Sequence, residues 1–359
     1  MLPSYTYDIA LSLLYRNGLR RALQLTNRFG SAEEAWHHVD EPDMTTCWER
    51  AVRECEWIER HGIRVYTLAD TDYPYRLRQC PDRPLVLYAK GNVHPSDGHI
   101  VSIVGTRHAT ERGKELTDQL VHELGERLEQ VTIVSGGAYG IDIAAHRAAI
   151  RYGLPTIIVP AHGLDRIYPA AHRPDAIAAL EHGGLLTEHV SETEPIATNF
   201  VRRNRIVAGL ADAVVVVESR AKGGSLITAR MALDYDRELF AFPGRPTDDT
   251  SHGCNQLIRA QEAHLIENAD HLIQTMNWTT RQTAHQPVQT SMVALQADLT
   301  ERQARLARLL QESEEGIHIN LLVMETGLDY SDVASDLVLM EMNGLVRSLP
   351  GGIYRLVRS

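Results

Sequence analysis

The chain has 359 residues, of which 43% are apolar and 23% are charged, and its formal net charge is -11. This is the composition of an ordinary globular protein long enough for two or three domains. The acidic balance argues against a general nucleic-acid binder, because non-specific attraction to phosphate grows with positive charge. Any site for a polyanion is therefore expected to be local.

Cysteine usage and the N-terminal segment indicate a reducing compartment. The four cysteines are scattered, and no CxxC pair predicts a zinc site or a disulfide framework. The first residues lack the basic and then apolar pattern of a signal peptide, and no apolar run is long enough to cross a bilayer. We therefore expect a cytoplasmic protein with no membrane contact, no metal and no cofactor.

Residues 1–75 are predicted to form an N-terminal helical domain. Apolar residues recur at spacings of three and four, interrupted at Gly18 and Gly30. Ser31 followed by Glu34 is a capping-box pattern that opens a helix. The helices resemble a helix-hairpin-helix or sterile-alpha-like (SAM-like) unit. The glycine-hydrophobic-glycine hairpin that grips a DNA backbone is absent, so helix packing is favoured over DNA binding.

Residues 76–273 are predicted to be a Rossmann-like core, with 76–97 as a lead-in segment. Short runs rich in Val and Ile predict buried strands at 99–105, 131–137, 155–161, 183–189, 213–219 and 238–244. Amphipathic segments between them predict helices at 111–129, 142–152, 173–182, 200–210 and 225–236. This alternation is typical of an α/β fold with a doubly wound parallel sheet covered on both faces.

A linker and a small last domain follow the core. Residues 274–299 begin with a stretch dominated by Thr and Gln, which is linker composition. Residues 300–359 predict a winged helix that ends in a hairpin turning at Pro350-Gly351-Gly352. The helix expected to read DNA, residues 331–343, carries three acidic residues and no basic one. A protein contact or simple packing is therefore expected there rather than DNA reading.

The carboxyl ends of the predicted strands carry glycines, hydroxyls and arginines. In an open parallel sheet, ligands bind at this edge. Glycine lets backbone N–H groups approach an anion closely, and arginine adds its planar fork. A glycine can also serve only for a tight turn, but several such loops on one edge favour a phosphate-rich ligand. The loops are Gly105-Thr106-Arg107, Ser135-Gly136-Gly137, Ala161-His162-Gly163 and Pro243-Gly244-Arg245, with Glu188 and Ser219 at two further ends.

Known nucleotide and metal motifs do not fit this edge. The first strand is followed by GTRHATERG rather than GxGxxG, and the phosphate loop GxxxxGK[ST] is absent, which disfavours NAD and P-loop chemistry. Asp142 and His146 lie four residues apart and could share a metal, but no third ligand is evident. Asp142 is more simply explained as a helix N-cap.

Taken in order, these segments are similar to the DNA-processing protein A (DprA, also called Smf) family. The resemblance runs from about residue 73 to 273 through SIVGTRHAT, VSGGAYGIDIAAHRAAI, GLDRIYPAAHR, GGLLTEH, FVRRNRIVAGLADAVVVVE, GGSLITARMAL and FAFPGRPTDDTSHGCNQLIR. It implies a Rossmann-like core that binds single-stranded DNA and forms homodimers. It also implies help in loading RecA recombinase on incoming strands during natural transformation, without catalysis.

The resemblance also implies DNA-binding residues. Arg107 matches the arginine that the family uses on DNA phosphates, and Arg203 and Arg205 match arginines beside the DNA path. Many members carry Lys or Arg where this chain has Tyr139, which removes a phosphate contact but supplies a ring for base stacking. The candidate set is completed by Gly105, Thr106, Gly136, Gly137, Gly140, Asn204, Lys222, Ser225 and Thr228.

We expect Arg107, Arg203 and Arg205 to form a cationic groove with the strand-end N–H groups, while Asn204 orders the loop. Arg202 is left open between groove and solvent. One alternative is an enzyme like the nucleotide phosphoribohydrolases, but KGGSLITAR lacks the glutamate that glycosidic cleavage needs. The other alternative is a scaffold that binds only proteins.

Overall fold

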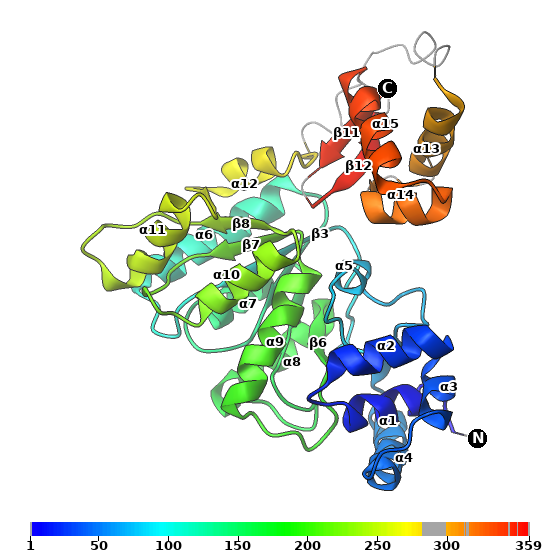
Figure 1. Ribbon diagram of the computed structural model, residues 1–359. Coiled ribbons are helices and arrows are strands. Elements are labelled where there is room, and N and C mark those ends of the chain that lie inside the picture. The colour runs from blue at the N-terminus through cyan, green and yellow to red at the C-terminus, as the bar shows by residue number, and fades with distance from the viewer. Residues whose placement is uncertain are drawn as a thin grey trace. The chain divides into compact units, whose positions relative to one another are not determined.

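The computed structural model describes residues 2–281, 299–311, 313, 316–343, 345–349 and 351–357. The chain divides into two compact units, one reaching to Ala269 and the other starting at Asp270 (Figure 1). Most of the predicted linker at 274–299, and Pro350 of the predicted hairpin turn, lie outside the described residues.

Four helices form the N-terminal part of the first unit: α1 (Thr6–Leu14), α2 (Leu19–Phe29), α3 (Ala32–His37) and α4 (Met44–His61). The side chain of Ser31 caps α3 by accepting a hydrogen bond from the Glu34 backbone N–H at 3.1 Å, as the capping-box pattern predicted. Gly30 ends α2 in the left-handed conformation, with φ of 86°. Apolar side chains of these helices share one core cluster with the neighbouring edge of the sheet.

Nine strands in the described chain form one sheet in the order β1-β2-β6-β5-β4-β3-β7-β8-β9. The strands from β6 to β9 in this order run parallel, whereas β1 and β2 are antiparallel additions at one edge. The strands are β1 (Arg64–Thr67), β2 (Val86–Gly91), β3 (His99–Val104), β4 (Val131–Ser135), β5 (Thr156–Ile158), β6 (Gly184–Thr187), β7 (Ala213–Val216), β8 (Glu238–Ala241) and β9 (His264–Leu265).

Helices cover the sheet on both faces. Helices α6, α7 and α8 pack side by side along one face, and α9 packs beside α10 and α5 on the other. Their bounds are α5 (Tyr75–Arg78), α6 (Glu111–Arg127), α7 (Ile141–Arg151), α8 (Arg173–His182), α9 (Ala197–Leu210) and α10 (Ser225–Asp234). Two further helices are α11 (His252–Arg259) and α12 (Ala269–Thr275), and short 3-10 turns span Ala170–His172 and Asp249–Ser251.

The predicted doubly wound Rossmann-like fold is confirmed. The chain leaves β3 toward β4 on one side, whereas β7 on the other side leads to β8, so the winding direction reverses between β3 and β7. Ligands of such sheets bind at the carboxyl edge near this reversal. The strands there are buried on both faces; Ile100, Ile103, Val134 and Val214 are fully enclosed.

The second unit contains the predicted winged helix. Its elements are α13 (Glu301–Gln311), β10 (Ile317–His318), α14 (Ile319–Thr326), α15 (Tyr330–Met342), β11 (Val346–Leu349) and β12 (Ile353–Leu356). The three strands pair antiparallel in the order β10-β12-β11. Leu306, Leu322, Leu337 and Met340 are fully buried among these elements, so the helices and the wing share a core of their own.

Candidate nucleic-acid interface

The loops after β3 and β4 pack closely against each other through glycines. Gly140 has φ of 81°, and a Cβ placed there would lie 2.1 Å from the Thr106 carbonyl oxygen. A Cβ on Gly105 would lie 2.5 Å from the Ile141 side chain. The Ile141 N–H donates to the same Thr106 carbonyl at 3.2 Å. Only glycine permits this approach, and the two loops therefore form one continuous rim at the carboxyl edge of the sheet.

Glu218, at the end of β7, fixes the loop after β3 from its other side. The Glu218 carboxylate accepts hydrogen bonds from the Thr110 N–H at 2.9 Å and the Thr110 hydroxyl at 2.5 Å. Its backbone carbonyl accepts from the half-buried Thr106 N–H at 2.8 Å. Thr110 in turn caps α6, accepting from the Gly113 N–H at 3.0 Å. The loop is anchored at both ends, and Arg107 is left exposed at its tip.

Arg203 lies beneath this rim. Its side chain reaches from α9 to the ends of β4 and β5, where one amino group donates to the carbonyls of Gly136, at 2.6 Å, and of Val159. Arg203 is only 3% exposed, and burial lowers its pKa to about 10 even though the nearby Asp142 carboxylate acts in the opposite direction. Its guanidinium is already engaged by backbone carbonyls, so direct binding of phosphate by Arg203 stays a prediction.

The other residues of the RRNR run are distributed among different partners. Arg205 is buried, pairs with the Glu188 carboxylate and donates to the Asp82 carbonyl at 2.5 Å. Arg202 donates to the Asn17 side chain at 3.3 Å and to the Arg16 carbonyl, which links α9 to the turn between α1 and α2. Asn204 is half-buried between them. The arginines of this run therefore mainly hold α9 against neighbouring elements, and they present little charge to solvent.

The candidate residues in the loop after β7 and in the following helix differ in their exposure to solvent. Lys222 is exposed, whereas Ser225 and Thr228 are buried on α10. The Ser225 hydroxyl donates to the Ser219 hydroxyl at 2.9 Å, which closes the loop onto the strand end. Because β7 is parallel to β3, Lys222 belongs to the same carboxyl edge as Arg107.

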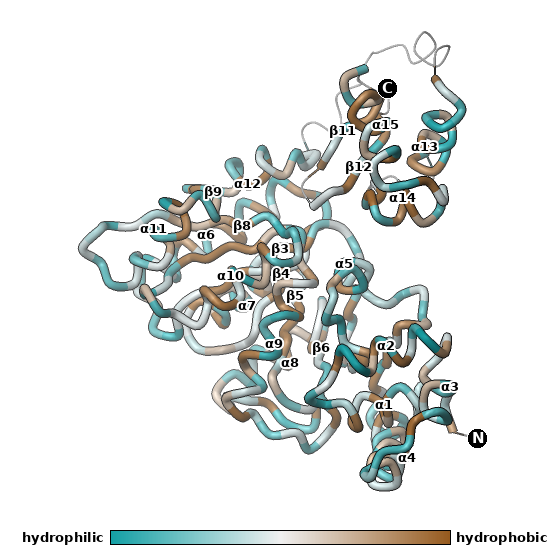
Figure 2. Tube along the Cα trace, viewed as in Figure 1, coloured by the Kyte–Doolittle hydropathy of each residue, from teal (hydrophilic) through white to brown (hydrophobic). Residues whose placement is uncertain are grey.

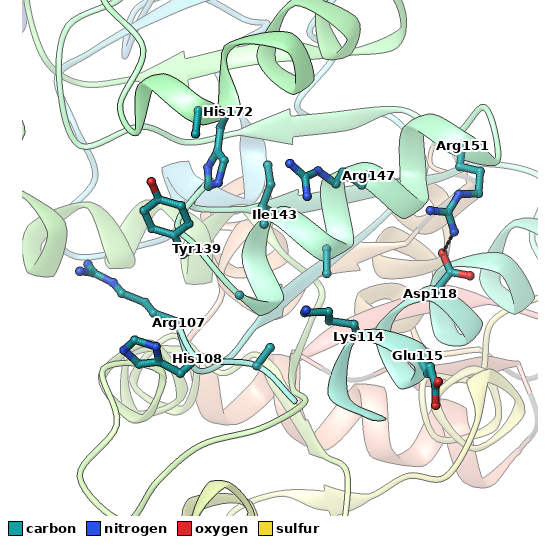
Figure 3. A pocket seen from close by; sticks show the side chains of 14 residues that line it. Arg107, His108, Lys114, Glu115, Asp118, Tyr139, Ile143, Arg147, Arg151 and His172 are labelled. Carbon is teal, nitrogen blue, oxygen red and sulfur yellow. Dashed lines mark hydrogen bonds and ion pairs between the residues drawn. The ribbon is translucent and has the colours of Figure 1, made fainter. Parts of the chain in front are cut away.

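A cavity of about 640 Å³ opens beside Arg107, between α6, α7 and the 3-10 turn (Figure 3). Four cations line it: Arg107, Lys114, Arg147 and Arg151. Three of these are paired with carboxylates, Lys114 with Glu111, Arg147 with Asp175 and Arg151 with Asp118. Among the described residues Arg107 has no ion pair, and its guanidinium carbon lies 5.2 Å from the centre of the Phe200 ring. Of these four cations, Arg107 is therefore the most available to a phosphate.

Tyr139 and His172 supply aromatic surface on the same cavity (Figure 3). Their ring centroids are 4.7 Å apart at an edge-on angle of 68°, and Tyr139 is 50% exposed. His172 is held in place by Nδ1, which lies 2.9 Å from the Gly137 carbonyl oxygen. A half-exposed tyrosine braced by a buried ring is a surface on which a base can stack.

Sequence reasoning missed Lys114, Arg147, His172 and Phe200. Each comes from a different segment, and only folding brings these segments around Arg107 and Tyr139. The one available signal was the spacing of four between Ile143 and Arg147, and again to Arg151, which places all three on the same side of α7.

The interpretation of Asp142 as a helix N-cap is wrong. Gly140 occupies the cap position, and the buried Asp142 carboxylate instead accepts a hydrogen bond from the Ala138 N–H at 3.4 Å. Burial raises the pKa of Asp142. His146 points into the interior, where its Nδ1 lies 2.8 Å from the Thr156 hydroxyl, and burial lowers its pKa to about 3. Within the residues that the structure covers, no three His, Cys, Asp or Glu side chains are grouped as metal ligands would be.

These features define a Rossmann-like protein with a carboxyl edge lined by glycines and cations and with a C-terminal winged helix. The family model described as DNA recombination-mediator protein A matches residues 64–277, and that of the DprA winged helix domain matches residues 291–352. The chain belongs to the DNA recombination-mediator protein A family. None of the described helices has both the length and the apolar character needed to cross a membrane.

Similar proteins agree with this assignment. The protein Smf of Escherichia coli K12 is 32% identical over 304 residues, covering 84% of this chain and 80% of Smf. The DNA processing protein DprA of Bacillus subtilis is 39% identical, covering 60% of this chain and 72% of its own. The crystal structure of DprA from Streptococcus pneumoniae is 28% identical with a TM-score of 0.64, over 75% of this chain and 97% of that one. DprA from Helicobacter pylori, described for its single-stranded DNA binding mode, is 32% identical with a TM-score of 0.54, over 60% and 96%.

Proposed function

We propose that this protein acts in DNA processing by binding single-stranded DNA along the carboxyl edge of its Rossmann-like sheet. The observation that carries the proposal is Arg107, exposed and without an ion pair among the described residues, beside a cavity of about 640 Å³. The single-stranded DNA binding mode described for the H. pylori relative supports it. A protein that binds single strands without sequence preference needs cations along the path of the phosphates and aromatic rings on which bases stack. It does not need side chains that recognise the edges of particular bases.

Within this proposal the residues divide into two groups. Arg107 and Lys222 contact phosphate, and the exposed ring of Tyr139 stacks on a base. Arg203 and Arg205 are positioning residues, because their guanidinium groups hold strand ends and loops from below. The glycines at 105, 136, 137 and 140 keep the rim close enough for backbone N–H groups to meet an anion.

Family membership also motivates the finer parts of the proposal. These are loading of RecA recombinase on the bound strand during natural transformation, a homodimer formed through the Rossmann-like core, and a cytoplasmic location. We further propose that the protein is not a catalyst. The segment KGGSLITAR lacks the glutamate that glycosidic cleavage needs, and its last residue, Arg230, pairs with Glu262 at 3.4 Å.

The test is a salt titration of affinity for a fluorescein-labelled dT20 strand, followed by fluorescence anisotropy. We expect Arg107→Ala to weaken binding roughly tenfold, since hydrogen bonds to charged groups contribute about 1.5–3 kcal/mol. The slope of log affinity against log salt should fall by about 0.7, the value for one lost phosphate contact on a single strand. Arg60→Ala, which removes an exposed arginine on α4, is the matched control. An Arg107→Ala variant with unchanged affinity and slope would place the groove elsewhere.

A further inference from the structure

The C-terminal half of the outward side of α15 in the winged helix is apolar. The exposed residues of this helix are Tyr330, Ser331, Ser335, Val338, Leu339 and Met342, and those from Ser331 onward follow helical spacing. Val338 and Leu339 are each 49% exposed and Met342 is 79% exposed. The inward side of the same helix buries Val333, Leu337 and Met340 in the core of the domain. Since a surface helix ordinarily presents polar residues outward, the apolar outer side calls for an explanation beyond folding.

Helix α14, which packs against α15, adds two exposed apolar side chains. Leu321 is 46% exposed and Met324 is 78% exposed. Brown segments, marking apolar residues, run along both helices in Figure 2. We refer to Leu321, Met324, Val338, Leu339 and Met342 together as the outer face. Flexible methionines are common at surfaces that accept partner helices, because they adapt to the shape of what binds.

The charge around the outer face is negative. Residues 319–343 contain five acidic residues and no lysine or arginine. Asp332 and Asp336 are compensated by Arg302 of α13, at 3.0 and 3.1 Å. Among the described residues, the exposed Glu325 and Asp329 carboxylates have no ion pair, while Arg305 donates to the Glu325 backbone carbonyl at 3.4 Å. The surface therefore combines apolar side chains with carboxylates that are not ion-paired.

We propose that the outer face docks a partner protein through a basic amphipathic helix, with apolar residues spaced three and four apart and Lys or Arg along its edges. The apolar residues would cover the outer face while the cations meet Glu325 and Asp329. Duplex DNA is a poor occupant, because α15 carries three acidic residues and no Lys or Arg to contact phosphates. A second copy is also disfavoured, since it would bring like charges together.

The proposal is tested on the full chain with a synthetic peptide of about 18 residues, with leucines at helical positions i, i+3, i+4 and i+7 and lysines elsewhere. A second peptide carries glutamate in place of lysine. We expect the lysine peptide to bind and the glutamate peptide not to bind. Leu339→Ser/Met342→Ser should weaken binding of the lysine peptide by about tenfold or more. Both side chains are exposed, so the fold should tolerate the change.

Two matched variants separate the contributions. Glu325→Gln/Asp329→Asn should weaken the peptide and flatten its salt dependence, whereas Ile177→Ser, at a 55% exposed position on α8, should change neither. Equal binding of the lysine peptide to the wild type and to Leu339→Ser/Met342→Ser overturns the proposal. The proposal is also overturned if Leu339→Ser/Met342→Ser binds the lysine peptide as before but loses binding to duplex DNA, or loses self-association measured by sedimentation. Affinity for dT20 should be unaffected throughout, which makes this test independent of the proposed function.

Discussion

Gly136 occupies a position where a side chain has no room. A Cβ there would lie 2.5 Å from the Arg203 guanidinium, which is fixed by two carbonyls. We therefore expect Gly136→Ala to displace Arg203 and to lower the free energy of unfolding by about 1–3 kcal/mol, the usual effect of overpacking. Urea denaturation followed by circular dichroism measures it. Gly224→Ala is the control, because its φ is -63° and its Cβ would meet no atom within 4 Å. Equal stability of the two variants would contradict the packing argument.

Arg107 and Arg203 should respond differently to substitution. Arg203→Met leaves the Gly136 and Val159 carbonyls without their donor, so we expect a loss of roughly 2–4 kcal/mol of stability together with weaker DNA binding. Arg107→Ala should weaken binding while stability changes by less than about 0.5 kcal/mol, because Arg107 is exposed. Unfolding and anisotropy measured on both variants provide the comparison. An Arg203→Met protein of unaltered stability would argue that Arg203 faces the ligand and not the strand ends.

Two buried histidines predict sensitivity to acid. Burial lowers the pKa of His146 to about 3 and that of His189 to about 4, against an ordinary value of 6.5. Between pH 6.5 and about 4 the unfolded chain binds protons that the folded chain excludes, so stability falls as pH falls. At pH 5 each of the two histidines should lower the free energy of unfolding by about 2 kcal/mol. Urea midpoints at pH 7.5 and 5.0 should differ less in His189→Asn than in the wild type, and His61→Asn, on an exposed position of α4, should keep the full difference.

The RRNR run shows what could not be predicted at the residue scale. In the sequence it is one basic cluster, and the natural expectation is one anion site. In the structure, Arg202 donates hydrogen bonds to the turn between α1 and α2, and Arg203 donates to carbonyls at two strand ends. Arg205 forms an ion pair with Glu188. The acceptors are mostly backbone carbonyls and lie at a wide range of distances along the chain. Composition records the charge of a residue but carries no information about such partners.

At the scale of elements, the buried parallel strands were predictable and the edge strands were not. Runs of Val and Ile bounded by glycine identified β3 to β8 within a few residues, because strands covered on both faces are continuously apolar. Strand β1 was missed: its four residues, RVYT, are separated from the end of α4 by two residues and lie within the segment predicted to be helical. Its strand character depends on antiparallel pairing with β2, some twenty residues later, which no local pattern reveals.

Glu218 connects three elements, so replacing it should affect the stability of the structure around all three. It holds the loop after β3 and the start of α6 from the end of β7. We expect Glu218→Gln to cost about 1–3 kcal/mol, since charge-assisted hydrogen bonds are lost in a buried site. Amide hydrogen exchange should accelerate specifically across residues 105–114. Glu238→Gln, at the partly exposed start of β8, should leave that segment protected as before. Unchanged exchange in Glu218→Gln would mean that the loop is held by its glycine contacts alone.

At the scale of the whole molecule, the acidic balance should make the proposed preference for single strands dependent on pH. The chain has a formal charge of -11 at pH 7, 17 histidines and a pI near 5.9, so its general repulsion of polyanions should largely vanish near pH 6. Binding at the proposed groove relies on an arginine and a lysine, Arg107 and Lys222, and not on histidine. Lowering the pH from 7.5 to 6.0 should therefore strengthen duplex binding more than dT20 binding, and the ratio of the dT20 affinity to the duplex affinity should fall.

Fluorescence anisotropy with dT20 and with a blunt 20-base-pair duplex, at about 50 and 200 mM salt, measures this ratio of affinities. The fall should be smaller at the higher salt, because surface charges are screened there. A ratio that stays constant with pH would show that the acidic surface has no part in selecting single strands and that the shape of the cavity alone excludes the duplex.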